Sequence, residues 1–156
     1  MSKTAWYIII AIVVIVIIIG GVLAYQYIQS GGTHPSGGTQ FDIYASDSPI
    51  YGFGNTAGSI ASPGPTMTFK AGQTVTVTLH NVGTVPHNWA IVSQKTDGNT
   101  NLAFSGAQIA TASNPVAAVS SQSVTFTVGS AGSYYYICQV DGHVSLGMWG
   151  TVTVNP

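Results

Sequence analysis

Residues 74–80 read TVTVTLH, and residues 123–128 read SVTFTV. In both stretches apolar side chains alternate with polar ones, and residues 151–154 (TVTV) repeat the pattern. Alternation with a period of two is typical of a β-strand that buries one face and exposes the other. Because the chain from residue 41 onward shows no long helical repeat, these stretches predict an all-β domain.

Shorter segments extend this pattern into a complete domain. Three further strands are predicted, at residues 67–69, 87–92 and 134–138. Residues 46–65 and 94–122 fit no strand well, so we expect long connections there, the second with a helical turn near residues 106–112. About seven short strands separated by glycine and proline clusters indicate a β-sandwich.

The amino-terminal segment differs from the rest of the chain. Residues 5–24 read AWYIIIAIVVIVIIIGGVLA and carry no charge. A helix of this length spans a hydrocarbon core of about 30 Å, and Lys3 at its start places the N-terminus in the cytoplasm by the positive-inside rule. We therefore expect a single-pass anchor in residues 1–28, with the following chain on the extracytoplasmic side of the cell membrane. A cleaved signal peptide ending at Ala24 is the alternative, although its apolar run is usually shorter.

The segment between the anchor and the β-rich domain has a linker composition. Residues 29–40 read QSGGTHPSGGTQ and lack a hydrophobic pattern, which is typical of a flexible tether. His34 in this segment is expected to be solvated. The predicted organisation is thus an anchor (residues 1–28), a linker (residues 29–40) and a folded domain (residues 41–156).

The charge and cysteine content exclude several classes of protein. The chain has three lysines, no arginine, four aspartates and no glutamate. So few basic residues cannot form the positive surface that binds nucleic acid. One cysteine, Cys138, cannot form an intramolecular disulfide, so it is a buried apolar residue, a reactive thiol or a metal ligand.

The neighbours of this cysteine favour a metal ligand. Residues 134–148 read YYYICQVDGHVSLGM, so His143 follows Cys138 by five residues and Met148 follows by five more. A glycine directly before the histidine and another before the methionine let the loop fold back on itself. Alone, the cysteine or the methionine would be explained as core packing. Together, a thiolate, an imidazole and a weak thioether match a type 1 copper site, which needs a second histidine.

Two histidines could complete this site. His80 has the parity of Thr78 and should point to solvent, whereas His87 enters a strand with the parity of Trp89 and Ile91. We therefore predict that His87 is the second histidine ligand.

These motifs resemble those of the blue copper proteins, or cupredoxins. The resemblance is carried by the spacing Cys-x4-His-x4-Met, the approach Tyr134-x-Tyr136-x-Cys138 and the segment Asn81-Val-Gly-x-x-Pro-His87-Asn88. The four-residue gaps are similar to those of rusticyanin and sulfocyanin, and the anchor and linker make sulfocyanin the nearest match. The resemblance covers residues 41–156. It differs at Gln139, where many cupredoxins have a small hydroxyl residue that bonds the asparagine after the first histidine.

The resemblance implies a Greek-key β-sandwich that holds one copper ion through His87, Cys138, His143 and Met148. It also implies an electron carrier of a respiratory chain rather than an enzyme, with a cytochrome or iron-oxidising component as donor and a terminal oxidase as acceptor. Partners are expected to dock mainly through apolar contacts, because six scattered charges cannot produce a strong steering field. Asp141 is expected to be the only charge near the ligand loop, residues 138–148; the other five are Lys70, Lys95, Asp42, Asp47 and Asp97.

Two other functions remain as alternatives. The domain could be a metal-free, membrane-tethered interaction domain, or a copper storage or delivery protein. A dinuclear copper site is excluded because it needs a second cysteine, and a trinuclear site because the chain has no His-x-His pair.

Overall fold

The computed structural model describes residues 38–156. The predicted anchor, His34 and all but the last three residues of the predicted linker lie outside the described residues. In the described part, no helix has the length and apolar character needed to cross a membrane.

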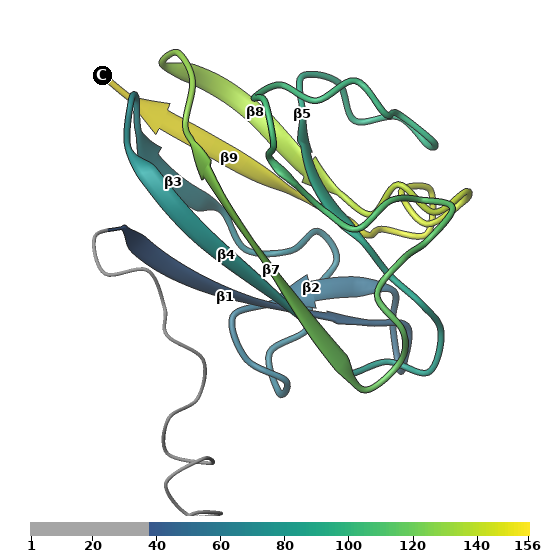
Figure 1. The fold of residues 1–156 in the computed structure, drawn as a ribbon. Coiled ribbons are helices and arrows are strands. Elements are labelled where there is room, and N and C mark those ends of the chain that lie inside the picture. The colour runs from purple at the N-terminus through teal and green to yellow at the C-terminus, as the bar shows by residue number, and fades with distance from the viewer. Residues whose placement is uncertain (1–37) are drawn as a thin grey trace, which may run out of the picture. The chain divides into compact units, whose positions relative to one another are not determined.

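The described chain forms two β-sheets (Figure 1). One sheet has the strand order β2-β1-β4-β7 and the other β3-β9-β8-β5-β6. The strands are β1 (Thr39–Ser46), β2 (Gly52–Gly54), β3 (Met67–Lys70), β4 (Thr74–Asn81), β5 (Trp89–Val92), β6 (Gln108–Ile109), β7 (Ser120–Thr127), β8 (Gly132–Ile137) and β9 (Trp149–Asn155). One hydrophobic core draws side chains from both sheets, so the domain is a β-sandwich.

Strand β4 shows how the alternating pattern produces this core. Val75, Val77 and Leu79 are fully buried. On the opposite face, the hydroxyls of Thr76 and Thr78 pair at 2.8 Å with hydroxyls of β7. Each such cross-strand pair stabilises a sheet by about 0.2–1 kcal/mol. The prediction of an all-β domain is therefore confirmed.

The strands differ from the expected ones in two connections. Strand β2 lies in the first long connection, residues 46–65, and β6 lies in the second. The helical turn expected near residues 106–112 is wrong, because Gln108 and Ile109 pair with β5 instead. Gly106 and Ala110, on either side, have positive φ values of 76° and 59°, which interrupt a right-handed helix. Strand β1 also begins at Thr39, two residues before the expected start of the domain.

One end of the five-stranded sheet brings the predicted ligands together. Cys138 directly follows β8, Met148 directly precedes β9, and His87 lies two residues before β5. Strand β8 pairs antiparallel with both β5 and β9. The end of β8 therefore lies beside the starts of its two neighbours.

Candidate metal centre

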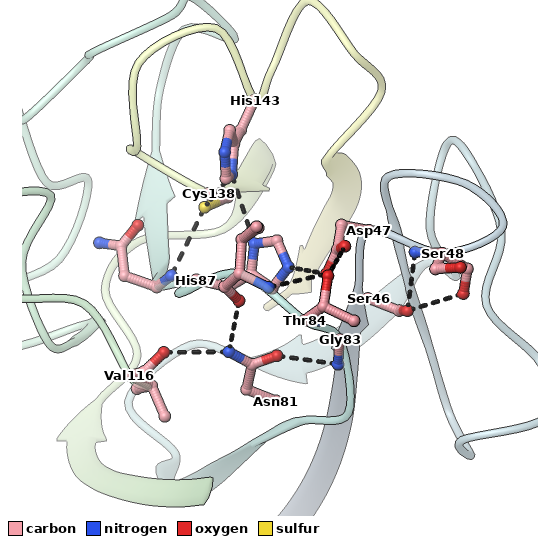
Figure 2. Close-up of polar contacts among 12 residues, drawn as sticks. Ser46, Asp47, Ser48, Asn81, Gly83, Thr84, His87, Val116, Cys138 and His143 are labelled. Atoms are coloured by element: carbon pink, nitrogen blue, oxygen red, sulfur yellow. Dashed lines mark hydrogen bonds and ion pairs between the residues drawn. The ribbon is translucent and has the colours of Figure 1, made fainter. Parts of the chain in front are cut away.

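Three of the predicted ligands converge at this end of the sheet. The metal-ligating atoms of His87, Cys138 and His143 all lie within 4.8 Å of one another. The two Nδ1 atoms are 3.3 Å apart, and Nδ1 of His143 is 3.3 Å from Sγ of Cys138. Figure 2 shows both rings turned toward the same region beside the sulfur. The structure thus brings His87, distant in sequence, to the loop that carries the other two.

Met148 reaches the same region through its backbone. Its N–H donates to the carbonyl of His143 at 2.9 Å, and its carbonyl accepts from the N–H of Cys138 at 3.0 Å. Gly147 turns the chain into this position with a φ of 107°, and a side chain there would collide with Ser62. The Met148 side chain is fully buried in the core. Met148 therefore closes the ligand loop, residues 138–148, through its backbone hydrogen bonds.

Burial controls the protonation of the cysteine. It raises the pKa of Cys138 to about 11, although backbone N–H groups of Asn88 and Val140 oppose this effect. The N–H of Asn88 lies 3.4 Å from the sulfur. The free thiol is therefore protonated at neutral pH, and a metal that binds it must displace the proton.

Burial keeps the two histidines in the form that binds metals. The pKa of His87 is lowered to about 4, mainly by burial and also by the nearby His143, while Asp47 acts in the opposite direction. Burial also lowers the pKa of His143, against the charges of Asp47 and Asp97. Both imidazoles are thus neutral near pH 7, and each can present a nitrogen lone pair to a metal.

The amides of Asn88 and Gln139 connect the two ligand segments. Asn88 donates from Nδ2 to Oε1 of Gln139 at 2.8 Å, and its Oδ1 accepts the backbone N–H of Gln139 at 2.6 Å. Gln139 also donates to the carbonyl of Asn99 and accepts from Gln108. It therefore holds Asn88, as the expected hydroxyl residue would, and joins it to two further segments.

A carboxylate that sequence analysis missed holds the other side of the ligand loop. Oδ1 of Asp97 accepts the backbone N–H groups of Val144 and Ser145 at 2.9 and 3.2 Å, and Oδ2 accepts the Ser145 hydroxyl. Lys95 lies with Nζ 3.3 Å from the ring centroid of Trp149. The expectation that Asp141 is the only charge near this loop is therefore wrong, because Asp97 and Lys95 approach it from a loop distant in sequence.

Asp47 and Tyr51 also contact the histidines of the cluster, and sequence analysis missed both. Oδ1 of Asp47 lies 3.4 Å from Nε2 of His87. The ring of Tyr51 lies edge-on to both histidines, with centroids 5.0 Å from His143 and 6.2 Å from His87. Neither residue stands near a ligand in sequence, so no spacing pattern could have indicated them.

His80 lies outside the cluster, as expected. Its ring bonds Asp42 at 2.8 Å and Ser121 at 2.9 Å and stacks on Tyr44. Its side chain is 28% exposed, so the ring is partly covered by these neighbours and does not point freely into solvent.

The donor set fits copper. A buried thiol and two neutral imidazoles suit copper in a trigonal arrangement, and a nearby thioether can act as a weak axial ligand. Of these three side chains, His87 bonds Asp47 through Nε2, and the sulfur of Cys138 accepts from the backbone N–H of Asn88.

Comparisons with known proteins agree with this chemistry. Residues 54–155 match the family of copper-binding proteins of the plastocyanin/azurin type. Auracyanin-A of Chloroflexus aurantiacus is 36% identical over 104 residues, which cover 57% of this chain and 64% of that protein. The chain thus matches less than two thirds of this curated relative's length.

Solved structures agree at the level of the fold. The structure of auracyanin A, described as a "blue" copper protein from the same bacterium, is 26% identical with a TM-score of 0.56 and covers 76% of this chain and 100% of its own. Rusticyanin from Thiobacillus ferrooxidans is 24% identical with a TM-score of 0.55, covering 76% of this chain and 79% of its own. The chain therefore belongs to the plastocyanin/azurin family of copper-binding proteins, the cupredoxins, with a site for one type 1 copper ion.

Proposed function

We propose that the protein is a blue copper electron carrier whose metal is bound by His87, Cys138, His143 and Met148. The observation that carries this proposal is the convergence of one thiol sulfur and one nitrogen from each of two imidazoles within 4.8 Å in a buried cluster. When bound, copper supplies a one-electron Cu(II)/Cu(I) couple. Auracyanin A, a related protein, is itself described as a blue copper protein.

The residues around the cluster support electron transfer more than metal transport. The Asn88–Gln139 pair and Asp97 hold both ligand segments from outside. Ligands that are fixed before the electron arrives need little rearrangement when the charge of the site changes. Fast one-electron transfer requires such a site, whereas a delivery site must open to release its metal.

His143 is the candidate exit for the electron. Of the four proposed ligands, His143 alone is accessible to solvent, with an exposed fraction of 9%. The exposed fraction is 0% for His87, Cys138 and Met148. Leu146, three residues further along the same loop, is 56% exposed. We propose that a redox partner docks on this apolar surface beside His143.

The proposed cellular setting of this function rests on the amino-terminal sequence. The apolar run of residues 5–24 and the linker after it support a single-pass membrane protein with an extracytoplasmic copper domain. In this setting the partners would belong to a respiratory chain, with a cytochrome or iron-oxidising component as donor and a terminal oxidase as acceptor. Recovery of the full chain in the membrane fraction, together with protease access to the copper domain from outside, tests the topology.

The copper assignment is tested by adding Cu(II) to the purified full chain and recording its visible spectrum and a redox titration. We expect an intense blue band and a one-electron transition. Cys138→Ser should abolish the band because it removes the thiolate, and His87→Ala should disrupt it. The matched control is His80→Ala, which should leave the spectrum unchanged.

Other results would identify the alternatives. A colourless full-length protein after copper addition would favour a metal-free interaction domain. Rapid loss of copper to a mild chelator would favour storage or delivery. A blue band that persists in Cys138→Ser would contradict the ligand assignment.

A further inference from the structure

Asp47 is a mostly buried carboxylate, and its neighbours do not neutralise its charge. Its side chain is 9% exposed. Among the described residues, its one ion-pair contact is with His87, at 3.4 Å. Buried carboxylates are rare unless a cation or a metal site stands nearby. The neighbouring positive charge here would be that of a metal ion held by the neutral ring of His87.

The loop before His87 is shaped to receive this carboxylate. Oδ1 of Asp47 accepts the backbone N–H groups of Thr84 and Val85 at 2.6 and 3.2 Å, and Oδ2 accepts the Thr84 hydroxyl at 2.6 Å. A side chain at Gly83 would collide with Oδ1 of Asp47. These contacts fix the carboxylate in position independently of its contact with the imidazole.

The geometry at His87 gives each ring nitrogen a separate role. Its Nδ1 faces the cluster, 3.3 Å from Nδ1 of His143, while its Nε2 faces Oδ1 of Asp47. Figure 2 shows Asp47 on the side of His87 away from Cys138. An ionised carboxylate can only accept hydrogen bonds, so the nitrogen that faces it is the one that carries the proton. The other nitrogen then keeps a free lone pair.

From these contacts we infer that Asp47 is a positioning residue for copper, which holds the proton of His87 on Nε2 and lowers the reduction potential through its negative charge. It acts through the ligand and does not touch the metal. The charge favours Cu(II) over Cu(I), since the oxidised ion carries the larger positive charge. This inference rests on the proposed copper site.

The first experiment needs no copper. Nitrogen-15 NMR of the histidine rings in the copper-free full chain near pH 7 reports which nitrogen carries each proton. We expect the His87 proton on Nε2, protected from exchange with solvent. A proton on Nδ1 would overturn the inference, whether or not any variant folds. Because the measurement excludes copper, its result is separate from that of the blue band, which tests the proposed function.

The second experiment separates the charge from the hydrogen bond. Asp47→Asn keeps an acceptor oxygen and removes the charge, so the ratio of Cu(II) to Cu(I) affinity should fall about tenfold, an upward shift of about 59 mV for one electron. Asp47→Ala also removes the acceptor, so we expect faster loss of copper and a mixture of His87 tautomers.

The control variants are matched to these changes. Asp42 contacts Nε2 of His80 just as Asp47 contacts Nε2 of His87, so Asp42→Asn should leave the potential unchanged. Thr84→Val removes one bond to Asp47 but leaves its charge, so it should lower the melting temperature with little effect on the potential. If Asp47→Asn and Asp42→Asn had the same potential as the unaltered protein, Asp47 would only anchor the loop, and the inference would be wrong.

Discussion

Met148 differs from the other three proposed ligands in how it can act on copper. Thiolate and imidazole make strong bonds, whereas a thioether makes a long, weak one. Its backbone closes the loop through Cys138 and His143, so the loop does not depend on the sulfur atom. A change of this side chain should therefore affect the redox properties more than the fold.

We predict that Met148→Leu keeps the blue band and raises the reduction potential. Leucine has a similar volume, so the buried site stays packed, typically at a cost below about 1.5 kcal/mol. The loss of an axial donor favours Cu(I), which needs fewer ligands. Redox titration of both proteins, with the visible spectrum as a check on the thiolate bond, measures the effect. An unchanged or lower potential would contradict an axial role for Met148.

The sequence predicted residues of the site that are linked by local spacing. Cys138, His143 and Met148 share one loop, and strand parity selected His87 over His80. Asp47 was missed because it lies 40 residues from His87, and it meets that ring only after β1 and β4 have paired. Carboxylates that support a site from a distant loop leave no signal in a single sequence.

At the level of elements, the ligand loop is held from outside by the loop that follows β5. Asp97 accepts two backbone N–H groups of the ligand loop, across 47 and 48 residues of sequence. Hydrogen bonds to a charged acceptor are stronger than those between neutral groups, although water competes for the exposed carboxylate of Asp97. The hydrogen bonds of Ser145 in this network also fix the backbone close to His143.

We predict that Asp97→Ala loosens this loop while leaving both sheets intact. Amide hydrogen exchange at Val144 and Ser145 should accelerate at least tenfold, because their N–H groups lose their acceptor. Amides in β4 and β7 should not change. Asp141→Ala is the matched control. It removes a carboxylate of the same loop that, within residues 38–156, accepts no hydrogen bond from a backbone N–H of this loop. Equal exchange rates in both variants would show that Asp97 does not hold the loop.

Strands with a local sequence pattern were predicted, whereas features that depend on long-range pairing were not. Strands β4, β7 and β9 alternate regularly, and all three were found. Strand β6 has two residues and exists through its pairing with β5, so its sequence carries no period to detect. The order of strands in the two sheets likewise depends on long-range pairing that the alternation leaves open.

For the whole molecule, the buried histidines make the copper-free protein sensitive to acid. The pKa of His87 is about 4 in the folded protein, against an ordinary value of 6.5. The unfolded chain therefore binds a proton at this residue between pH 6.5 and 4 while the folded chain does not. Wherever the unfolded state binds more protons than the folded state, the free energy of unfolding rises with pH. It therefore decreases as the pH falls from 6.5 to 4.

We predict that His87 alone lowers the free energy of unfolding of the copper-free protein by about 3 kcal/mol between pH 6.5 and pH 4. Burial shifts the pKa of His143 in the same direction, which adds to the loss. Urea unfolding at several pH values measures the fall, and His87→Gln should remove most of it. The control is His80→Gln. A fall of the same size in His87→Gln would assign the sensitivity to other groups.

The charge of the domain determines how it meets a partner. The described residues have two lysines, Lys70 and Lys95, and four aspartates, of which Asp47 and Asp97 accept hydrogen bonds within the domain. So few charges cannot produce the strong field that steers a highly charged partner. The exposed Leu146, beside His143, instead offers an apolar contact surface.

We therefore predict that electron self-exchange between oxidised and reduced copies depends weakly on salt and strongly on this apolar surface. The rate is measured by NMR line broadening as the ionic strength rises from about 10 mM to 500 mM, over which screening shortens from about 30 Å to a few Å. We expect a change below about threefold, whereas a pair governed by charge would change tenfold or more.

Leu146→Asp should slow the reaction at least tenfold by placing a carboxylate beside His143. Thr153→Asp adds the same charge to an exposed position of β9, four residues beyond Trp149, and should have little effect. A steep dependence on salt, or equal slowing in the two variants, would show that charge rather than apolar contact governs the encounter.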